Sequence, residues 1–165
     1  MLLIDNEIVE SVWQQVAAYD DEQASQGMDK LRDNQAELIE YVLVTLDGMG
    51  EEVLEVAVYV MYVVCSIFEQ ASNGKLKQVT NDEILSAHQS NQQLRLTPNP
   101  SARAFHEKYG TLEQTRQPYV TRYVIDALVE EDAGEEPVEL TQDQISSAYL
   151  ILRTVIDVLD MALDE

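Results

Sequence analysis

Apolar residues recur at intervals of three and four positions along most of this chain, and no segment alternates convincingly at intervals of two. Near the C-terminus, for example, Leu152, Val155 and Leu159 fall on one face of a helix. An interval of two is typical of strands, so the pattern predicts an all-α fold. We expect a single domain, 1–165, built from six or seven helices near 6–22, 28–48, 51–72, 81–95, 100–109, 117–132 and 142–163.

The segment 51–72 is the most apolar part of the chain. Its uncharged stretch, 56–68, is 13 residues long, whereas a membrane-spanning helix needs about 18 residues or more. Its β-branched and aromatic residues favour a strand, but the stretch is longer than a usual strand and glutamates precede it, where a helix dipole favours anions. We therefore predict no membrane partner and a buried central helix, with the last helix packed along it.

Two signals mark how these helices begin and repeat. The six glycines are expected between the helices, and the pairs Thr80/Glu83 and Thr141/Gln144 fit the capping box that starts a helix. In addition, residues 35–46 and 117–128 share glutamine, tyrosine, valine and leucine at matching positions. This similarity indicates either a duplicated helical hairpin or a chance likeness between two amphipathic helices.

The charge balance excludes several functions. The chain has 31 acidic and 10 basic residues, which gives a net charge of −21. Direct binding of nucleic acid is excluded, since it depends on neutralisation of phosphates by lysine and arginine. The single cysteine, Cys65, excludes a disulfide framework and a cysteine-based zinc site, and its apolar surroundings predict a core residue. With no secretory signal, we expect a cytoplasmic protein.

The middle of the chain differs from the rest. Residues 73–128 carry seven basic and five acidic side chains, whereas the flanking segments are strongly acidic. One interpretation is a surface that binds an anionic ligand or an acidic peptide. The alternative is that these cations lie over the acidic helices and relieve their repulsion. The candidate ligand-binding residues are Arg95, Arg103, His106, Lys108 and Arg116.

A pattern of carboxylates provides an enzymatic hypothesis. Glu37 and Glu40 lie on one expected helix, and Glu52 and Glu55 open the next, which continues as an apolar run with tyrosine. This arrangement resembles the MazG-type nucleotide pyrophosphohydrolases, all-α enzymes with Glu-Glu-x-x-Glu and Glu-x-x-Asp on consecutive helices. The resemblance implies that the four glutamates hold Mg²⁺. The chain departs from the pattern at Ala36, in place of the first glutamate, and at Glu55, in place of the aspartate.

The acidity itself favours a different class of function. An all-α domain with this charge is expected to be a non-enzymatic interaction module, without a cofactor, whose acidic face binds a basic partner protein. The alternative is that the acidity only maintains solubility. Wide apolar stripes on several helices also predict a face for a second copy, and hence a homodimer. The Mg²⁺-dependent pyrophosphohydrolase is the second hypothesis.

Overall fold

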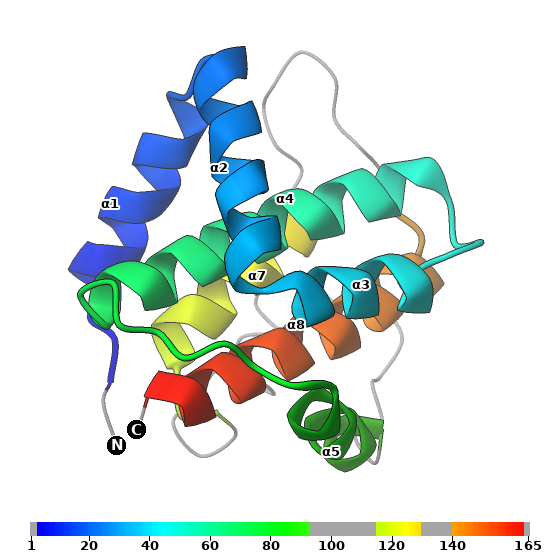
Figure 1. The fold of residues 1–165 in the computed structure, drawn as a ribbon. Helices are drawn as coiled ribbons and strands as arrows, with labels where there is room; N and C mark the ends of the chain where they lie inside the picture. The colour runs from blue at the N-terminus through cyan, green and yellow to red at the C-terminus, as the bar shows by residue number, and fades with distance from the viewer. Residues whose placement is uncertain (1–2, 93–114, 130–139, 164–165) are drawn as a thin grey trace.

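The structure is a computed structural model that describes residues 3–92, 115–129 and 140–163 (Figure 1). Within these residues the chain forms seven α-helices and no strand, which confirms the predicted all-α bundle. The helices are α1 (Asn6–Ala17), α2 (Asp21–Asn34), α3 (Ala36–Thr45), α4 (Glu51–Ala71), α5 (Asn81–Gln92), α7 (Pro118–Val129) and α8 (Gln142–Leu163). The expected helix at 100–109 lies outside the described residues.

Helices α4 and α8 cross the middle of the molecule and pack against each other (Figure 1). Helices α1, α3 and α7 also pack against α4, and α5 and α7 pack against α8. Burial on most sides outweighs the strand propensity of α4, so the predicted central helix is confirmed. The described helices include none that is both long enough and apolar enough to cross a membrane. The largest buried side chains of this pair include Met61, Ile67, Phe68, Tyr149, Leu152, Ile156 and Leu159.

The predicted capping boxes are both present. Thr80 Oγ1 accepts from the Glu83 amide at 3.3 Å, and Glu83 Oε1 accepts from the Thr80 amide at 3.1 Å. The same reciprocal bonds join Thr141 and Gln144, at 3.1 and 2.9 Å. Gln144 Nε2 also donates to the carbonyl of Met49 at 3.0 Å. The first turn of α8 is therefore tied to the turn that precedes α4.

The boundary expected for the first helix, 6–22, is wrong because the chain starts a new helix at Asp21. Helix α1 ends at Ala17, and Asp20 caps α2. The Asp20 carboxylate accepts from the Gln23 amide at 2.8 Å, and the Gln23 side chain accepts from the Asp20 amide at 3.0 Å. This third capping box uses aspartate and glutamine, which satisfy the free amides of a helix start as threonine and glutamate do.

The single helix expected over 28–48 is also wrong, because Gln35 separates α2 from α3. This residue has φ −139° and ψ 50°, outside the helical region. Its side chain is 3% exposed. Gln35 Nε2 donates to the carbonyl of Lys77, and Gln35 Oε1 accepts from the amide of Val79, both at 3.0 Å. A buried carboxamide bonded to a distant segment of backbone thus fixes the break.

Gln117 has the matching position before α7 and a matching role. Its side chain is 1% exposed. Gln117 Oε1 accepts from the amide of Ile4 at 2.9 Å, and Gln117 Nε2 donates to Asp160 at 2.8 Å. Each of the two glutamines precedes a helix that packs against the next helix along the chain, α3 on α4 and α7 on α8. The two glutamines therefore have similar places in the fold, and the duplicated helical hairpin stays a prediction.

Gly27 corrects the expectation that the glycines lie between helices, because it lies inside α2. Glycine in a helix interior costs about 1 kcal/mol relative to alanine. A Cβ atom at this position would overlap the hydroxyl oxygen of Tyr62, which comes from α4. The absence of a side chain therefore allows the Tyr62 phenol to reach α2, and this contact helps to set the distance between the two helices.

The substitution Gly27→Ala tests this contact. We expect it to lower the free energy of unfolding by about 1 kcal/mol, because overpacking outweighs the gain in helix propensity. In a Tyr62→Ala background the overlap is absent, so the same substitution is expected to raise the free energy of unfolding. Urea denaturation followed by circular dichroism measures both effects. Equal destabilisation in the two backgrounds would contradict the proposed contact.

Candidate functional site

The four glutamates expected to hold Mg²⁺ are on α3 and α4. Glu40, Glu52 and Glu55 are exposed, whereas Glu37 is half-buried. Glu37 Oε2 is buried and has no hydrogen-bond partner in the described part of the chain. Among the described residues, no group of three or more His, Cys, Asp or Glu side chains is placed to hold a metal ion. The structure does not bring the four carboxylates together, and the Mg²⁺ hypothesis stays a prediction.

Of the five expected ligand-binding residues, the structure describes only Arg116. Arg95, Arg103, His106 and Lys108 lie outside the described residues. Arg116 lies just before α7, and its Nε is 2.9 Å from Asp160 Oδ2. This cation is therefore paired with an acidic residue of α8, as the interpretation of charge relief expects. Its role in ligand binding stays a prediction.

A buried group of charged residues on α8 was not predicted from the sequence. Arg153, Asp157 and Asp160 follow one another at helical spacing in the C-terminal half of α8. Asn91 of α5 joins them, because its Nδ2 is 3.0 Å from Asp157 Oδ2. We call these four residues and Arg116 the α8 polar cluster. The only sequence signal was a set of charged residues inside an apolar segment.

The α8 polar cluster balances two arginines against two aspartates. Burial raises the pKa of the Asp157 carboxyl, while the hydrogen bond from Asn91 and the positive charge of Arg153 oppose that rise. The negative charge of Asp160 adds to the rise. Charges removed from water are tolerated only when they are paired and hydrogen-bonded. The cluster therefore fixes α5 and the segment before α7 against α8.

The one described histidine and the single cysteine both lie in packing contacts. The Tyr41 hydroxyl of α3 is 2.7 Å from His88 Nδ1 of α5, and the two rings meet edge to face. Burial raises the pKa of Tyr41, while a hydrogen bond with Thr154 opposes that rise. Cys65 is buried, and burial raises the pKa of its thiol to about 12. Cys65 is therefore a core residue, as expected, and its thiol stays protonated at neutral pH.

Two hollows lie beside α2, and Tyr62 lines both of them. We call the one between α1, α2 and α4 the polar cleft, with a volume of about 660 Å³. Its neighbour, between the end of α1, α2, α3 and α4, is the apolar groove, with a volume of about 580 Å³. Tyr19 also lines both hollows, and its ring meets that of Tyr62 edge to face, with 6.3 Å between the centroids. Burial, with Tyr19 adding to it, raises the pKa of Tyr62 to about 12.

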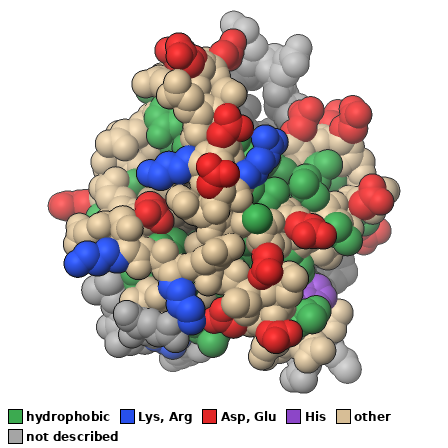
Figure 2. Space-filling model, in the orientation of Figure 1, with side chains coloured by type: hydrophobic (Ala, Val, Ile, Leu, Met, Phe, Trp, Pro, Cys, Tyr) green, Lys and Arg blue, Asp and Glu red, His purple; other side chains and the backbone are tan. Residues whose placement is uncertain are grey.

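The apolar groove opens onto a surface where large hydrophobic side chains are exposed. Leu43 and Val44 of α3 are 42% and 67% exposed, and Tyr59 of α4 is 46% exposed. Figure 2 shows hydrophobic side chains gathered to the right of α2, with acidic side chains around them. A cluster of this kind marks an interaction site more often than single exposed residues do. The residues that line the groove include Met28, Leu43, Leu54, Val58, Tyr59 and Tyr62.

Carboxylates surround this groove. Glu55 lines it directly, and Glu52 precedes Tyr59 by two helical turns on the same side of α4. Glu40 and Asp47 lie about one turn before and after Leu43. Of the four glutamates expected to bind Mg²⁺, Glu55 therefore lines the apolar groove, and helical spacing puts Glu40 and Glu52 near its edge; we call these three the acidic rim.

The chain matches no protein-family model, no curated protein and no solved structure. The comparisons therefore identify no family, and the likeness to the pyrophosphohydrolases rests on the sequence pattern alone.

The substitution Asp160→Ala is expected to be strongly destabilising. It removes the acceptor for both Arg116 Nε and Gln117 Nε2, at a carboxylate that is 3% exposed. Because the buried Gln117 amide loses its acceptor and the half-exposed Arg116 loses its counter-charge, we expect a loss of about 2 kcal/mol in the free energy of unfolding. Asp143→Ala, in the exposed first turn of α8, is the matched control. A loss at Asp160 no larger than that at Asp143 in urea denaturation would contradict this role.

The raised pKa of Asp157 predicts a pH dependence. The folded protein holds this proton more tightly than the unfolded chain does, so the stabilisation is complete below the unfolded pKa. It is lost as the pH rises through the folded pKa. Asp157→Asn keeps an acceptor for Asn91 without the charge. We expect the stability of this variant relative to wild type to increase from about pH 4 to about pH 7. A constant difference in urea denaturation across that range would refute the prediction.

Proposed function

We propose that this protein is a non-enzymatic interaction module that binds a basic partner protein through the apolar groove. The observation that carries the proposal is that Leu43 and Tyr59, both large and exposed, line the apolar groove together with Glu55. Burial of these side chains against a partner would remove apolar surface from water. We propose the cytoplasm as the compartment, since the free thiol of Cys65 suits a reducing environment.

The shape of the groove favours an amphipathic helix as the bound segment. The walls are helices, with Met28 on α2, Leu43 on α3 and Leu54 on α4. Such grooves typically accept the apolar face of a partner helix, whose anchoring side chains recur at intervals of three and four. The volume of about 580 Å³ suits a few anchoring side chains. The rest of the partner helix would lie over the exposed cluster.

The acidic rim favours a basic partner over a second copy of this chain. Each copy carries a net charge of −21 and the same carboxylates around the groove, so a groove-to-groove dimer would place like charges opposite each other. Lysines or arginines on the polar face of a partner helix would instead meet Glu40, Glu52 and Glu55 at the rim. Charge complementarity of this kind accelerates encounter and selects the partner.

We expect this protein to bind a fluorescein-labelled amphipathic peptide of about 18 residues, built from leucine and lysine at helical spacing. Fluorescence anisotropy measures its Kd. The double variant Leu43→Ser with Tyr59→Ser is expected to raise Kd by about tenfold, because both residues contact the apolar face of the peptide. Leu85→Ser is the matched control, because Leu85 is 54% exposed but lies on α5. This control should leave Kd unchanged.

The contribution of the acidic rim to peptide binding is measured by the dependence of Kd on salt concentration. Raising monovalent salt from about 50 to about 300 mM is expected to weaken binding. The pair Glu52→Gln and Glu55→Gln should reduce that dependence more than Glu7→Gln with Asp82→Asn, which removes two exposed carboxylates elsewhere. Equal binding of a peptide with the same composition in scrambled order would contradict a groove-specific contact. A dimer in light scattering that Tyr59→Ser abolishes would assign the groove to a second copy.

A further inference from the structure

The face of α2 that borders the polar cleft is polar and exposed. The residues of α2 that line it include Gln26, Lys30 and Asn34. They recur at intervals of four, so they share one face. In α2, only Leu31 is buried. An amphipathic helix normally turns an apolar stripe towards its neighbours. This face of α2 instead borders a hollow.

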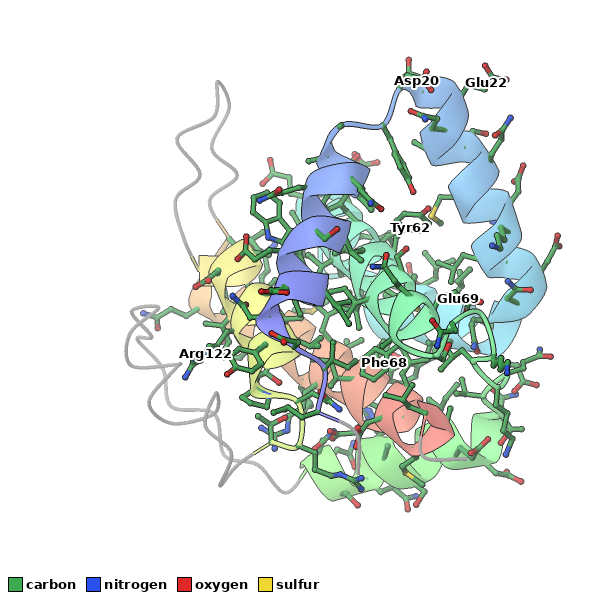
Figure 3. The ribbon with its side chains drawn as sticks, turned by 90° about the vertical axis from the view of Figure 1, so that its left-hand side faces the viewer. Asp20, Glu22, Tyr62, Phe68, Glu69 and Arg122 are labelled. Atoms are coloured by element: carbon green, nitrogen blue, oxygen red, sulfur yellow. The ribbon has the colours of Figure 1, made fainter. Side chains whose placement is uncertain are left out.

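The side of the polar cleft that α4 forms is also largely polar. Tyr62, Ser66, Glu69 and Gln70 line it from α4, at helical spacing on a helix that is otherwise mostly apolar. Figure 3 shows Tyr62 and Glu69 on the part of α4 that lies between α1 and α2. Gln15 lines the cleft from α1. Three helices thus bring polar side chains to one hollow from separate parts of the sequence.

The lining of the cleft is nearly free of charge, although the chain as a whole is highly acidic. Lys30 and Glu69 are its only charged residues, and they cancel. Most of the other polar groups are carboxamides, which donate and accept hydrogen bonds side by side. In the described part of the chain, Gln15, Asn34 and Gln70 form no side-chain hydrogen bond, so their carboxamides are available to a ligand.

We propose that the polar cleft binds a small uncharged molecule with adjacent hydrogen-bond donors and acceptors, of the kind found in a nucleoside or a sugar. Paired donors and acceptors match the carboxamides that line the cleft. The volume of about 660 Å³ lies within the usual range for small-molecule sites. An anionic ligand is disfavoured, because the charges of Lys30 and Glu69 cancel within the cleft and the net charge of −21 repels anions. This site shares Val16, Tyr19 and Tyr62 with the groove proposed for the basic partner, and its other lining residues are its own.

Isothermal titration with adenosine, cytidine, uridine, glucose and maltose tests the proposal and separates its two sources of ligand. At least one of these compounds is expected to bind with a Kd below about 1 mM. Adenosine monophosphate, which adds a negative charge, should bind more weakly than adenosine. Gln15→Ala combined with Gln70→Ala is expected to raise the Kd of the bound compound by about tenfold. Gln14→Ala with Gln92→Ala, at exposed carboxamides outside the cleft, is the matched control.

Each outcome bears on the proposal. Binding of nucleosides or of sugars alone identifies the source and supports it, provided that the cleft variant weakens binding and the control does not. Circular dichroism and the melting temperature verify that both variants fold. The proposal is overturned if none of the five compounds binds. It is equally overturned if the cleft variant and its control behave alike, or if the monophosphate binds more tightly than adenosine.

Discussion

The packing of α4 against α8 is the contact on which the remaining structure depends. Helix α4 offers apolar side chains on most of its circumference, so it is stable in water only when other helices surround it. The stripe on α8 predicted one buried face, yet most of its C-terminal half is enclosed, including Thr154 and Asp160. Because both helices are buried, the polar residues on α8 must find partners inside the protein, and this requirement creates the α8 polar cluster. The α8 polar cluster in turn holds α5 and the segment before α7 against α8.

The helical class and the central helix were predictable because they depend on apolar periodicity, which the sequence displays directly. The breaks were harder to predict. Asp20 ends the first helix through a capping box with Gln23, a signal present in the sequence but weaker than the apolar pattern around it. Gln35 breaks the next helix because its carboxamide bonds to backbone more than forty positions away. Those partners lie far away in the sequence, so the apolar periodicity alone predicted a continuous helix through Gln35.

The candidate site was less predictable than the fold. Glu37, Glu40, Glu52 and Glu55 were predicted as a set of Mg²⁺ ligands, and the structure places Glu55 in the lining of the apolar groove and leaves Glu40 and Glu52 exposed. The spacing of carboxylates along two helices fixes which face each occupies only when the rotation of each helix is known. That rotation is set by tertiary packing, including the contact between Tyr62 and Gly27. Gly27 was expected between helices, because glycine usually marks a helix end. The residue that requires glycine at this position is Tyr62, which lies on another helix and cannot be identified from the local sequence.

Helix α2 is the shared wall of both hollows, and its sequence explains why it serves there. A helix with Leu31 as its only buried residue leaves much of its surface to line the hollows beside it. On the groove side that surface offers Met28 beside exposed hydrophobic residues, with carboxylates at the rim. On the cleft side it offers carboxamides and Lys30, with few acidic groups. Each hollow has one carboxylate in its lining, Glu55 in the groove and Glu69 in the cleft, so the two differ in their uncharged residues. The groove is lined mostly by hydrophobic side chains and the cleft largely by carboxamides, because α2 presents a different face to each hollow.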